Sequence, residues 1–290
     1  MAAAEAVLQA ELLEVAVEAA RAAGVELLAR WRRPLEVGTK STPTDPVTEA
    51  DVSAERAIRA VLARRRPEDS ILGEEGGETP GTTGHRADGV SSRKENDNDS
   101  DSHYHLGSKG PLRWVVDPLD GTVNFMYGLP TFAVSIAVED ARGALAAVVL
   151  DPVRDELFTA TRSGGALSNG EPIASSGCDD LARALVGTGF GYEPAVRAAQ
   201  AEVVSRVLPL ARDIRRAGAA ALDMCWCASG RLDAYYERGV KPWDIAAGTL
   251  ICERAGLVVR SLEARGVLPS GVVVAAPALI DELMDLVSGS

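Results

Sequence analysis

The sequence predicts an α/β (α+β) protein, with a mixed or antiparallel sheet followed by a smaller, more parallel sheet. In the first half, helical patterns precede a run of strands, and in the second half strands and helices alternate. A chain of 290 residues can bury a sizeable core, as one large domain or as two packed halves. We therefore expect an N-terminal α+β subdomain over 1–176 and a C-terminal α/β subdomain over 177–290.

Two helices and a short strand are expected near the N-terminus. Residues 5–33 carry acidic side chains three and four positions apart, with leucines on the remaining face, which is typical of an amphipathic helix. A second helix is expected from Thr48 to Arg66, because its apolar residues share helical spacing and Pro67 ends it. Ser70–Leu72 then predicts a strand that leads into Gly73-Glu74-Glu75.

The composition changes abruptly over 78–111. This stretch is rich in Gly, Ser, Thr, Asp and Asn, and its only aliphatic residues are Val90 and Leu106. It cannot bury enough apolar area to offset the entropy lost on ordering, so the sequence predicts a disordered or mobile insertion. All three histidines of the chain lie within it.

A meander of strands is expected after this segment. The strand 112–116 runs directly into Asp117, the strands 131–139 and 144–150 form a hairpin, and 156–161 is a further strand. The second half predicts strands at 184–186, 232–236 and 272–275. Between and after them we expect helices from Pro194, over 219–229 and 244–254, and over 277–287.

Charge and rare residues exclude several functions. The formal net charge of −12 gives no broad basic surface for nucleic acid, so no direct nucleic-acid partner is expected. No segment reaches the roughly twenty apolar residues that span a membrane, and residues 1–13 lack the basic start of a secretory signal. The four cysteines form no metal-binding spacing, which favours buried free thiols and a cytoplasmic location.

The most informative string is Trp114-Val115-Val116-Asp117-Pro118-Leu119-Asp120-Gly121-Thr122-Val123-Asn124-Phe125. A hydrophobic strand delivers two carboxylates at its C-terminal end, where open α/β folds bind ligands. Gly121 lets a ligand approach the backbone, and a short helix beginning there would direct N–H groups toward an anion. The alternative for the tetrapeptide alone is a solvated Asx turn.

Further carboxylates follow the same design. Glu74 and Glu75 come after a strand and a glycine, and Asp244 lies near a helix start, where N-capping is the simpler role for it alone. Oxygen ligands without paired cysteines or accessible histidines suit Mg²⁺, Mn²⁺ or Ca²⁺ better than zinc. Two such ions about 3.5–4 Å apart can clamp a phosphate and activate water.

At this point the chain resembles a known family, the inositol monophosphatases of the Mg²⁺-dependent, lithium-sensitive sugar phosphatase superfamily. The motifs that carry the resemblance are Lys40–Asp51, Gly73-Glu74-Glu75, Asp117–Phe125, Gly218–Asp223 and Glu237…Trp243–Gly248. The stretch from Arg215 to Asp223 is most similar to the bacterial SuhB-type branch. The resemblance implies a layered αβαβα sandwich, and it covers the chain except for 78–111.

The resemblance also implies roles for single residues. The first metal would be bound by Glu74, Asp117 and the carbonyl of Leu119, and the second by Asp117, Asp120 and Asp244. Glu74 would help to hold a third.

The other roles concern substrate and water. Gly121 and Thr122 would donate to the phosphate, and Gly218, Ala220 and Glu237 would face the polyol. Glu74 and Thr122 would orient the attacking water, with Asp51 hydrogen-bonded to Thr122. Lys40 and Glu75 would lie on loops beside the metals, although solvent exposure is the default for Lys40, and Asp51 could equally favour a helix dipole.

The function expected from the motifs and the resemblance is Mg²⁺-dependent hydrolysis of myo-inositol monophosphate to inositol and phosphate by metal-activated water. Two or three Mg²⁺ per site, with Mn²⁺ as a substitute, and a homodimer are implied. One alternative is a broader sugar phosphatase that also accepts fructose-1,6-bisphosphate. Another is a SuhB-like transcription and rRNA-processing partner, with the basic cluster of Arg212, Arg215 and Arg216 as its surface.

Overall fold

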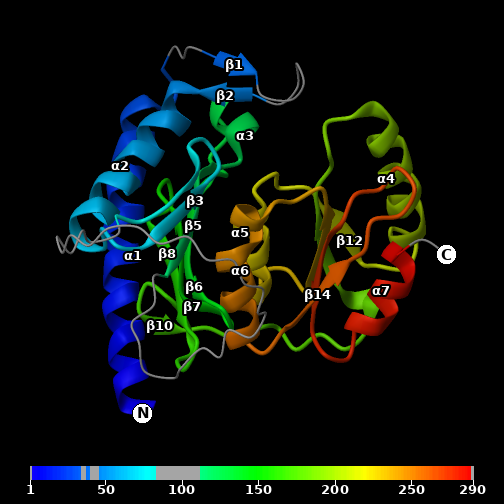
Figure 1. Ribbon diagram of the computed structural model, residues 1–290. Coiled ribbons are helices and arrows are strands. Elements are labelled where there is room, and N and C mark those ends of the chain that lie inside the picture. The colour runs from blue at the N-terminus through cyan, green and yellow to red at the C-terminus, as the bar shows by residue number, and fades with distance from the viewer. Residues whose placement is uncertain (1, 34–36, 40–45, 83–111, 289–290) are drawn as a thin grey trace, which may run out of the picture.

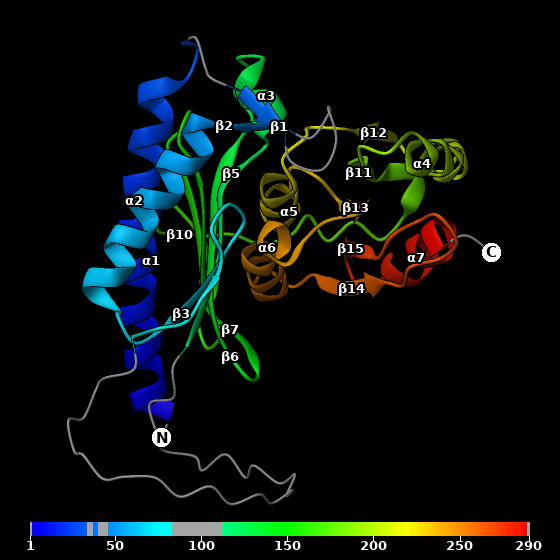
Figure 2. The same cartoon turned by 45° about the horizontal axis from the view of Figure 1, so that its top comes forward.

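The computed structural model describes residues 2–33, 37–39, 46–82 and 112–288. Figures 1 and 2 show five layers: a helix pair, a large sheet, a second helix pair, a smaller sheet and a third helix pair. The expected αβαβα sandwich is therefore confirmed. Between the two sheets lie α5 (Ala220–Ala228) and α6 (Pro242–Arg254), which makes them the shared layer of the molecule.

The larger sheet has the strand order β10-β9-β8-β7-β6-β5-β3-β4 and is antiparallel except for the β3–β5 pair. Its strands are β3 (Ser70–Gly73), β4 (Gly77–Thr79), β5 (Arg113–Asp120), β6 (Ala133–Asp140), β7 (Gly143–Asp151), β8 (Glu156–Thr161), β9 (Ala166–Ser168) and β10 (Glu171–Pro172). The outer face is covered by α1 (Ala2–Arg30) and α2 (Glu49–Arg65). Fully buried side chains such as Leu12, Ile58 and Trp114 fill this interface.

The smaller sheet has the order β12-β11-β13-β15-β14, with parallel pairs around β11 and antiparallel pairs around β15. Its strands are β11 (Leu185–Thr188), β12 (Asp213–Arg215), β13 (Ala234–Arg238), β14 (Val258–Leu262) and β15 (Gly271–Ala275). The helices α4 (Pro194–Val207) and α7 (Ile280–Ser288) lie on its outer side. A short hairpin of β1 (Val37–Thr39) and β2 (Pro46–Thr48) stands apart near α3 (Thr122–Met126).

The expected start of the insertion at residue 78 is wrong. Glu78 and Thr79 belong to β4, where they pair with Leu72 and Ile71 of β3. The side chains of β4 are exposed, so its stability comes from backbone pairing, which a count of apolar residues does not detect. Residues 83–111 of the expected insertion lie outside the described residues.

Two further observations bear on expectations from the sequence. No helix of the described part is long and apolar enough to cross a membrane. Cys178, Cys225, Cys227 and Cys252 are all free. Cys225 and Cys227 of α5 and Cys252 of α6 are buried, as expected for structural thiols, whereas Cys178 is only partly buried.

Candidate active site

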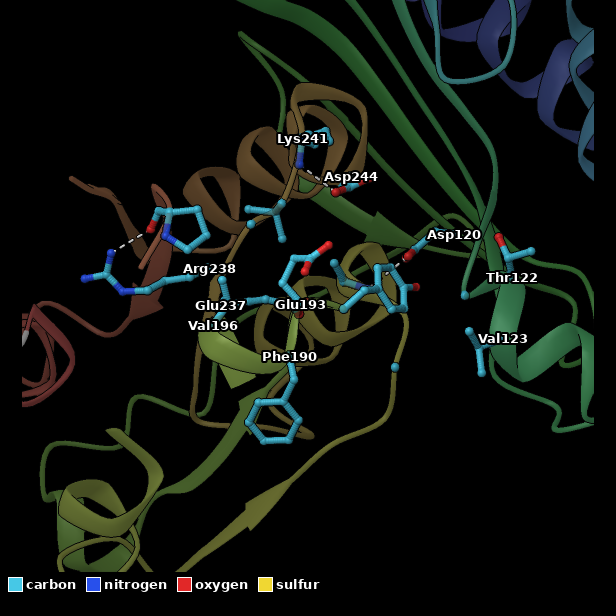
Figure 3. Close-up of a pocket in the computed structure, with 18 of the residues that line it drawn as sticks. Asp120, Thr122, Val123, Phe190, Glu193, Val196, Glu237, Arg238, Lys241 and Asp244 are labelled. Atoms are coloured by element: carbon cyan, nitrogen blue, oxygen red, sulfur yellow. Dashed lines mark hydrogen bonds between the residues drawn. The ribbon is translucent and has the colours of Figure 1, made fainter. Parts of the chain in front are cut away.

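A cavity of about 610 Å³ opens between the two sheets, at the ends of α5 and α6. Figure 3 shows Thr122 and Val123 on one side of it and Phe190, Glu237 and Arg238 on the other. Its carboxylate-bearing lining residues come from distant parts of the chain: Glu74, Asp117, Asp120, Glu193, Glu237 and Asp244. The fold therefore brings together acids that the sequence separates by as much as 170 positions.

A β-bulge directs the two central aspartates into this cavity. Asp117 pairs with Ser135 and Asp120 with Ala133, so three steps on β5 oppose two steps on β6. In a regular strand, residues three apart point to opposite faces, and the extra residue restores them to the same side. The strand thus continues to Asp120, beyond the end at Val116 that the sequence predicted.

Asp117 is buried, with only 2% of its surface exposed. Its Oδ1 accepts a hydrogen bond of 3.0 Å from the Leu119 N–H, which is an Asx-type contact, but not the solvated turn that was the alternative. Burial and then the negative charges of Glu74, Asp120 and Asp244 hold the pKa of Asp117 well above its ordinary value. Without a positive charge nearby, ionisation of this group is strongly disfavoured.

Asp120 connects the two halves of the molecule. Its carboxylate accepts hydrogen bonds from the N–H groups of Ala220 (3.1 Å) and Ala221 (2.7 Å) at the start of α5. These donors lie at a helix N-terminus whose own cap residue, Ala219, has no side-chain acceptor. Burial and the charge of Asp244 raise the pKa of Asp120, while the bond from Ala221 opposes that rise.

Asp244 combines the capping role and the site location that the sequence left as alternatives. It lies in the first turn of α6, and its Oδ2 accepts a 2.6 Å hydrogen bond from the Lys241 N–H. It also lines the cavity. Burial raises its pKa to about 7, against the effect of the Lys241 bond, and the charges of Glu74 and Glu237 add to the rise.

The Gly121–Thr122 corner joins β5 to α3. Gly121 has φ +91°, and a Cβ there would lie 2.9 Å from the Thr131 carbonyl oxygen, so only glycine fits without strain. The Thr122 hydroxyl lies 3.1 Å from both Asp51 Oδ1 and the Leu119 carbonyl. The contact between Asp51 and Thr122 that the resemblance implied is therefore present, and Asp51 is fully buried.

The far wall carries Glu237, which accepts a 2.6 Å hydrogen bond from the Tyr235 hydroxyl. Burial raises the pKa of Glu237, while the Tyr235 bond and the charge of Arg216 lower it. A Cβ on Gly189 would lie 1.9 Å from Glu237 Oε2, so the glycine makes room for this side chain. Gly218 and Ala220 also line the cavity.

Asn124 fixes the turn that contains Gly218 beside the Gly121 corner. Its amide nitrogen donates to the carbonyls of Thr131 (2.7 Å) and Ala217 (2.9 Å). This side chain was part of the quoted motif, but no role was expected for it.

The glutamates after β3 occupy different places. Glu74 lines the cavity, whereas Glu75 is absent from its lining, and the Glu75 N–H instead donates to Glu55 at 2.7 Å. Lys40 lies outside the described residues. The roles assigned to these residues stay predictions, although the cavity contains Glu74 and the other expected ligands Asp117, Leu119, Asp120 and Asp244.

The sequence did not reveal several other residues that line the cavity. Arg216 lines the cavity, although the sequence placed it in a surface cluster with Arg212 and Arg215. Phe190, Tyr192 and Val196 add an apolar face, and apolar residues in a loop and a helix carry no chemical signal that distinguishes them from core. Only the position of Arg216, two residues before Gly218, pointed toward the site.

The donor set fits a hard cation. All the expected ligands are carboxylate or carbonyl oxygens, which is the chemistry that Mg²⁺ prefers, and their mutual repulsion is what a cation would relieve. Among the described residues, no group of three or more His, Cys, Asp or Glu side chains already forms a metal-holding arrangement. The fit therefore concerns the kind of donor, and not a finished coordination geometry.

The chain is similar to known proteins over most of its length. The family model described as "Inositol monophosphatase family" matches residues 8–288. An inositol-1-monophosphatase of Mycobacterium bovis is 44% identical over 253 residues, which are 86% of this chain and 80% of the relative. A protein of Pasteurella multocida named Nus factor SuhB is 38% identical over 279 residues, 94% of each chain. The crystal structure of the extragenic suppressor protein SuhB from Bartonella henselae superposes with a TM-score of 0.81 at 30% identity, covering 96% of this chain and 99% of that one.

Proposed function

The chain belongs to the inositol monophosphatase family and is a phosphatase, and we propose that it hydrolyses myo-inositol monophosphate to inositol and phosphate. The observation that carries the proposal is the convergence of Asp117, Asp120 and Asp244 on one cavity beside the Gly121–Thr122 corner. The three carboxylates would hold cations at one end of the cavity. The Gly121–Thr122 corner would hold the phosphate between these cations and the wall that carries Glu237.

Residues at different positions in the cavity would have different roles. The N–H groups of Gly121 and Thr122 would donate to the phosphate oxygens. The Thr122 hydroxyl, held by Asp51 at 3.1 Å, would orient the attacking water together with Glu74. Glu237 would accept hydrogen bonds from ring hydroxyls, while the Tyr235 hydroxyl keeps its carboxylate in place.

We propose Mg²⁺ as the cofactor, two or three ions per site, with Mn²⁺ as a substitute and with inhibition by lithium. Asp117 would be shared between two ions, Glu74 and the Leu119 carbonyl would complete one site, and Asp120 and Asp244 the other. When bound, the ions supply positive charge to the phosphoryl oxygens and the leaving alkoxide, and they favour ionisation of a water molecule near neutral pH.

Asp117→Asn tests the proposal. The amide keeps the size of the side chain and can still accept from the Leu119 N–H, but it removes the shared negative charge. We expect Mg²⁺-dependent release of phosphate from inositol monophosphate to fall by more than about 10³-fold, as for loss of a charge that acts in the transition state. Asp155→Asn, at a side chain 83% exposed, should keep wild-type activity. Substantial activity in Asp117→Asn would contradict the proposal.

A specific observation favours the broader sugar phosphatase as a second candidate. Arg216 lines the cavity with its guanidinium beside Gly218, and within the described residues no hydrogen bond or ion pair engages it. A second phosphate on a substrate, as in fructose-1,6-bisphosphate, would accept hydrogen bonds from this guanidinium. Side-by-side kcat/KM values for the two substrates decide between the candidates, and Arg216→Gln should reduce the value for the bisphosphate more strongly.

A lower-ranked candidate function is that of a transcription and rRNA-processing partner, which the name of the relative Nus factor SuhB supports. The basic cluster is its proposed surface, although Arg215 is paired with Asp213 and Arg212 donates to the Arg183 carbonyl. A pulldown of transcription proteins that requires Arg212 and Arg215 but tolerates Asp117→Asn would support it. We also propose a cytoplasmic homodimer, with the four free cysteines in favour of a reducing compartment.

A further inference from the structure

Helix α2 directs a regular series of charged residues toward the site. Asp51, Glu55 and Arg59 are four positions apart and so share one face of the helix. Asp51 contacts Thr122 at the end of β5. Glu55 instead contacts the segment between β3 and β4, which carries Glu74 and Glu75, and Arg59 contacts β4 itself, which follows that segment. One helix face therefore meets both loops that would hold the reacting groups.

Glu55 is almost fully buried, with 3% of its surface exposed. Its Oε2 accepts from the Glu75 N–H at 2.7 Å, and its Oε1 accepts from the Gly76 N–H at 2.8 Å. Two adjacent backbone N–H groups of the loop are thus bonded to a single carboxylate. Hydrogen bonds to an ionised acceptor are stronger than those between neutral groups.

Arg59 completes the contact from the same helix. Its Nε donates to Glu55 Oε1 at 2.6 Å, Nη2 to the Gly77 carbonyl at 3.0 Å and Nη1 to the Thr79 hydroxyl at 2.9 Å. The buried charge of Glu55 is therefore compensated, which is the condition for keeping such a pair in a folded protein.

Glycines on both sides of the two glutamates allow this close approach. A Cβ on Gly73 would lie 2.7 Å from Glu55 Oε1, and a Cβ on Gly76 would lie 2.5 Å from the same oxygen. The Gly-Glu-Glu-Gly segment thus combines two acidic side chains with two positions that admit the buried ion pair.

We propose that Glu55 and Arg59 are positioning residues that hold the loop carrying Glu74 and Glu75 in a fixed position relative to Thr122. The rigid spacing along α2 fixes the Glu74 loop relative to the Thr122 corner, which Asp51 contacts from the same face. This inference rests on the proposed function, since it acquires catalytic meaning only if Glu74 serves as a metal ligand.

Glu55→Gln tests the role, because the amide can accept from one of the two N–H groups but not from both. We expect the Mg²⁺ concentration for half-maximal phosphatase activity to rise about tenfold and kcat to fall, with KM for inositol monophosphate unchanged. In protein without added metal, amide hydrogen exchange measured over residues 73–79 should accelerate about tenfold.

Asp69→Asn is the matched control. Asp69 is also a buried carboxylate paired with an arginine, Arg66, the residue that follows α2. It accepts from the Leu112 N–H and the Trp114 indole, but at the opposite end of β3. This variant should lower stability without changing the Mg²⁺ requirement or the exchange of 73–79. Arg59→Lys keeps the positive charge but loses the paired hydrogen bonds to Gly77 and Thr79. It should raise the Mg²⁺ requirement and the exchange rate of 73–79 as Glu55→Gln does, but by a smaller factor. This variant replaces Glu55→Gln as the test if Glu55→Gln does not fold.

The outcomes separate the two claims. If the wild type shows no Mg²⁺-dependent hydrolysis, the proposed function fails, and the exchange measurement alone still decides whether Glu55 and Arg59 hold the loop. If the wild type is active but Glu55→Gln and Arg59→Lys match Asp69→Asn in both readouts, the positioning role is overturned and the pair serves stability alone.

Discussion

At the scale of single residues, Gly121 is the position where backbone conformation and close contact coincide. Its φ of +91° lies in the left-handed region, and its missing Cβ leaves room for the Thr131 carbonyl and Ala219. Gly256, after α6, has the same φ of +91° but nothing within 4 Å of its Cβ position. A comparison of Gly121 with Gly256 therefore separates the conformational effect of an added methyl group from its steric effect.

We expect Gly256→Ala to lower the free energy of unfolding by about 1–2 kcal/mol, the cost of an L-residue in this conformation. Gly121→Ala should lower it by about 3 kcal/mol, because the contact with Thr131 adds to that cost, and it should also abolish phosphatase activity. Urea denaturation of both variants gives the comparison. Equal losses of stability would mean that the contact at Gly121 is relieved by a backbone shift.

At the scale of elements, Asp140 and Arg162 join the antiparallel strands β6, β7 and β8 at the end where the β6–β7 turn lies. The Arg162 guanidinium donates to Asp140 at 2.7 and 3.0 Å and also to the Gly143 and Ala144 carbonyls. The hydrogen bond from Arg162 lowers the pKa of Asp140 from 3.8 to about 2, in spite of partial burial. The pair connects the end of β6 to β8 across the β6–β7 turn.

Because this pKa is lower in the folded protein, Asp140 stabilises the fold above pH 4 and loses that effect as the pH falls through 2. Asp140→Asn should therefore cost about 1 kcal/mol or less at pH 7, since solvent screens the pair. The difference from the wild type should close between pH 4 and pH 2. Free energies of unfolding across this range measure it, and a constant difference would assign the effect to something other than the charge. Asp155→Asn, at an exposed side chain, should stay near wild type throughout.

At the scale of the whole molecule, α5 and α6 lie between the two sheets (Figure 2), and the cavity opens at the ends of these helices. Asp120 extends from β5 to the N-terminus of α5, and Asn124 extends to the Ala217 carbonyl, so the site and the junction share residues. We propose that 1–176 and 177–290 are subdomains whose relative position is set here. Burial of several acids at this junction opposes folding, because like charges in a low-dielectric cavity repel.

A cation that binds the junction should therefore stabilise the entire molecule. At a Mg²⁺ concentration of about 100 times its Kd, we expect the free energy of unfolding to rise by about 2.7 kcal/mol. Calorimetric melting with Mg²⁺ and with EDTA measures this. Asp117→Asn should lose most of the increase, yet melt no lower than the wild type in EDTA, because one of the repelling charges is gone. If the Tm of the wild type is the same with Mg²⁺ and with EDTA, the proposed cation site at the junction is contradicted.

The elements that the sequence predicted best are those with a strong local pattern. The helix expected from Thr48 to Arg66 is α2 over Glu49–Arg65, and the strand expected over 156–161 is β8. The elements that it missed depend on partners. β4 is exposed and exists through pairing with β3, and β14 reads as Val-Val-Arg-Ser-Leu without a clear alternation but pairs along β15.

The candidate site divides in the same way. Asp117, Asp120 and Glu74 were predicted because carboxylates after strands, with glycines beside them, form a local pattern. Asp244 was predicted from its place near a helix start and from the resemblance. Glu55 and Arg59 were not recognised, because on a helix such a pair at four-residue spacing is indistinguishable from an ordinary surface ion pair. Their function depends on a loop that arrives from 20 residues later.

The sequence by itself determined the α/β class and the oxygen-rich chemistry of the site, because hydrophobic periodicity and short motifs are properties of neighbouring residues. The same motifs carried the resemblance to the family, and that resemblance implied the layered sandwich. Tertiary structure alone decided that a bulge turns Asp117 and Asp120 to one side, that Asp120 binds the N-terminus of α5, and that Arg216 faces the cavity instead of the surface. Each of these depends on strand register or on the packing of two sheets. Register and packing arise from contacts between residues far apart in the chain, and no local pattern encodes them.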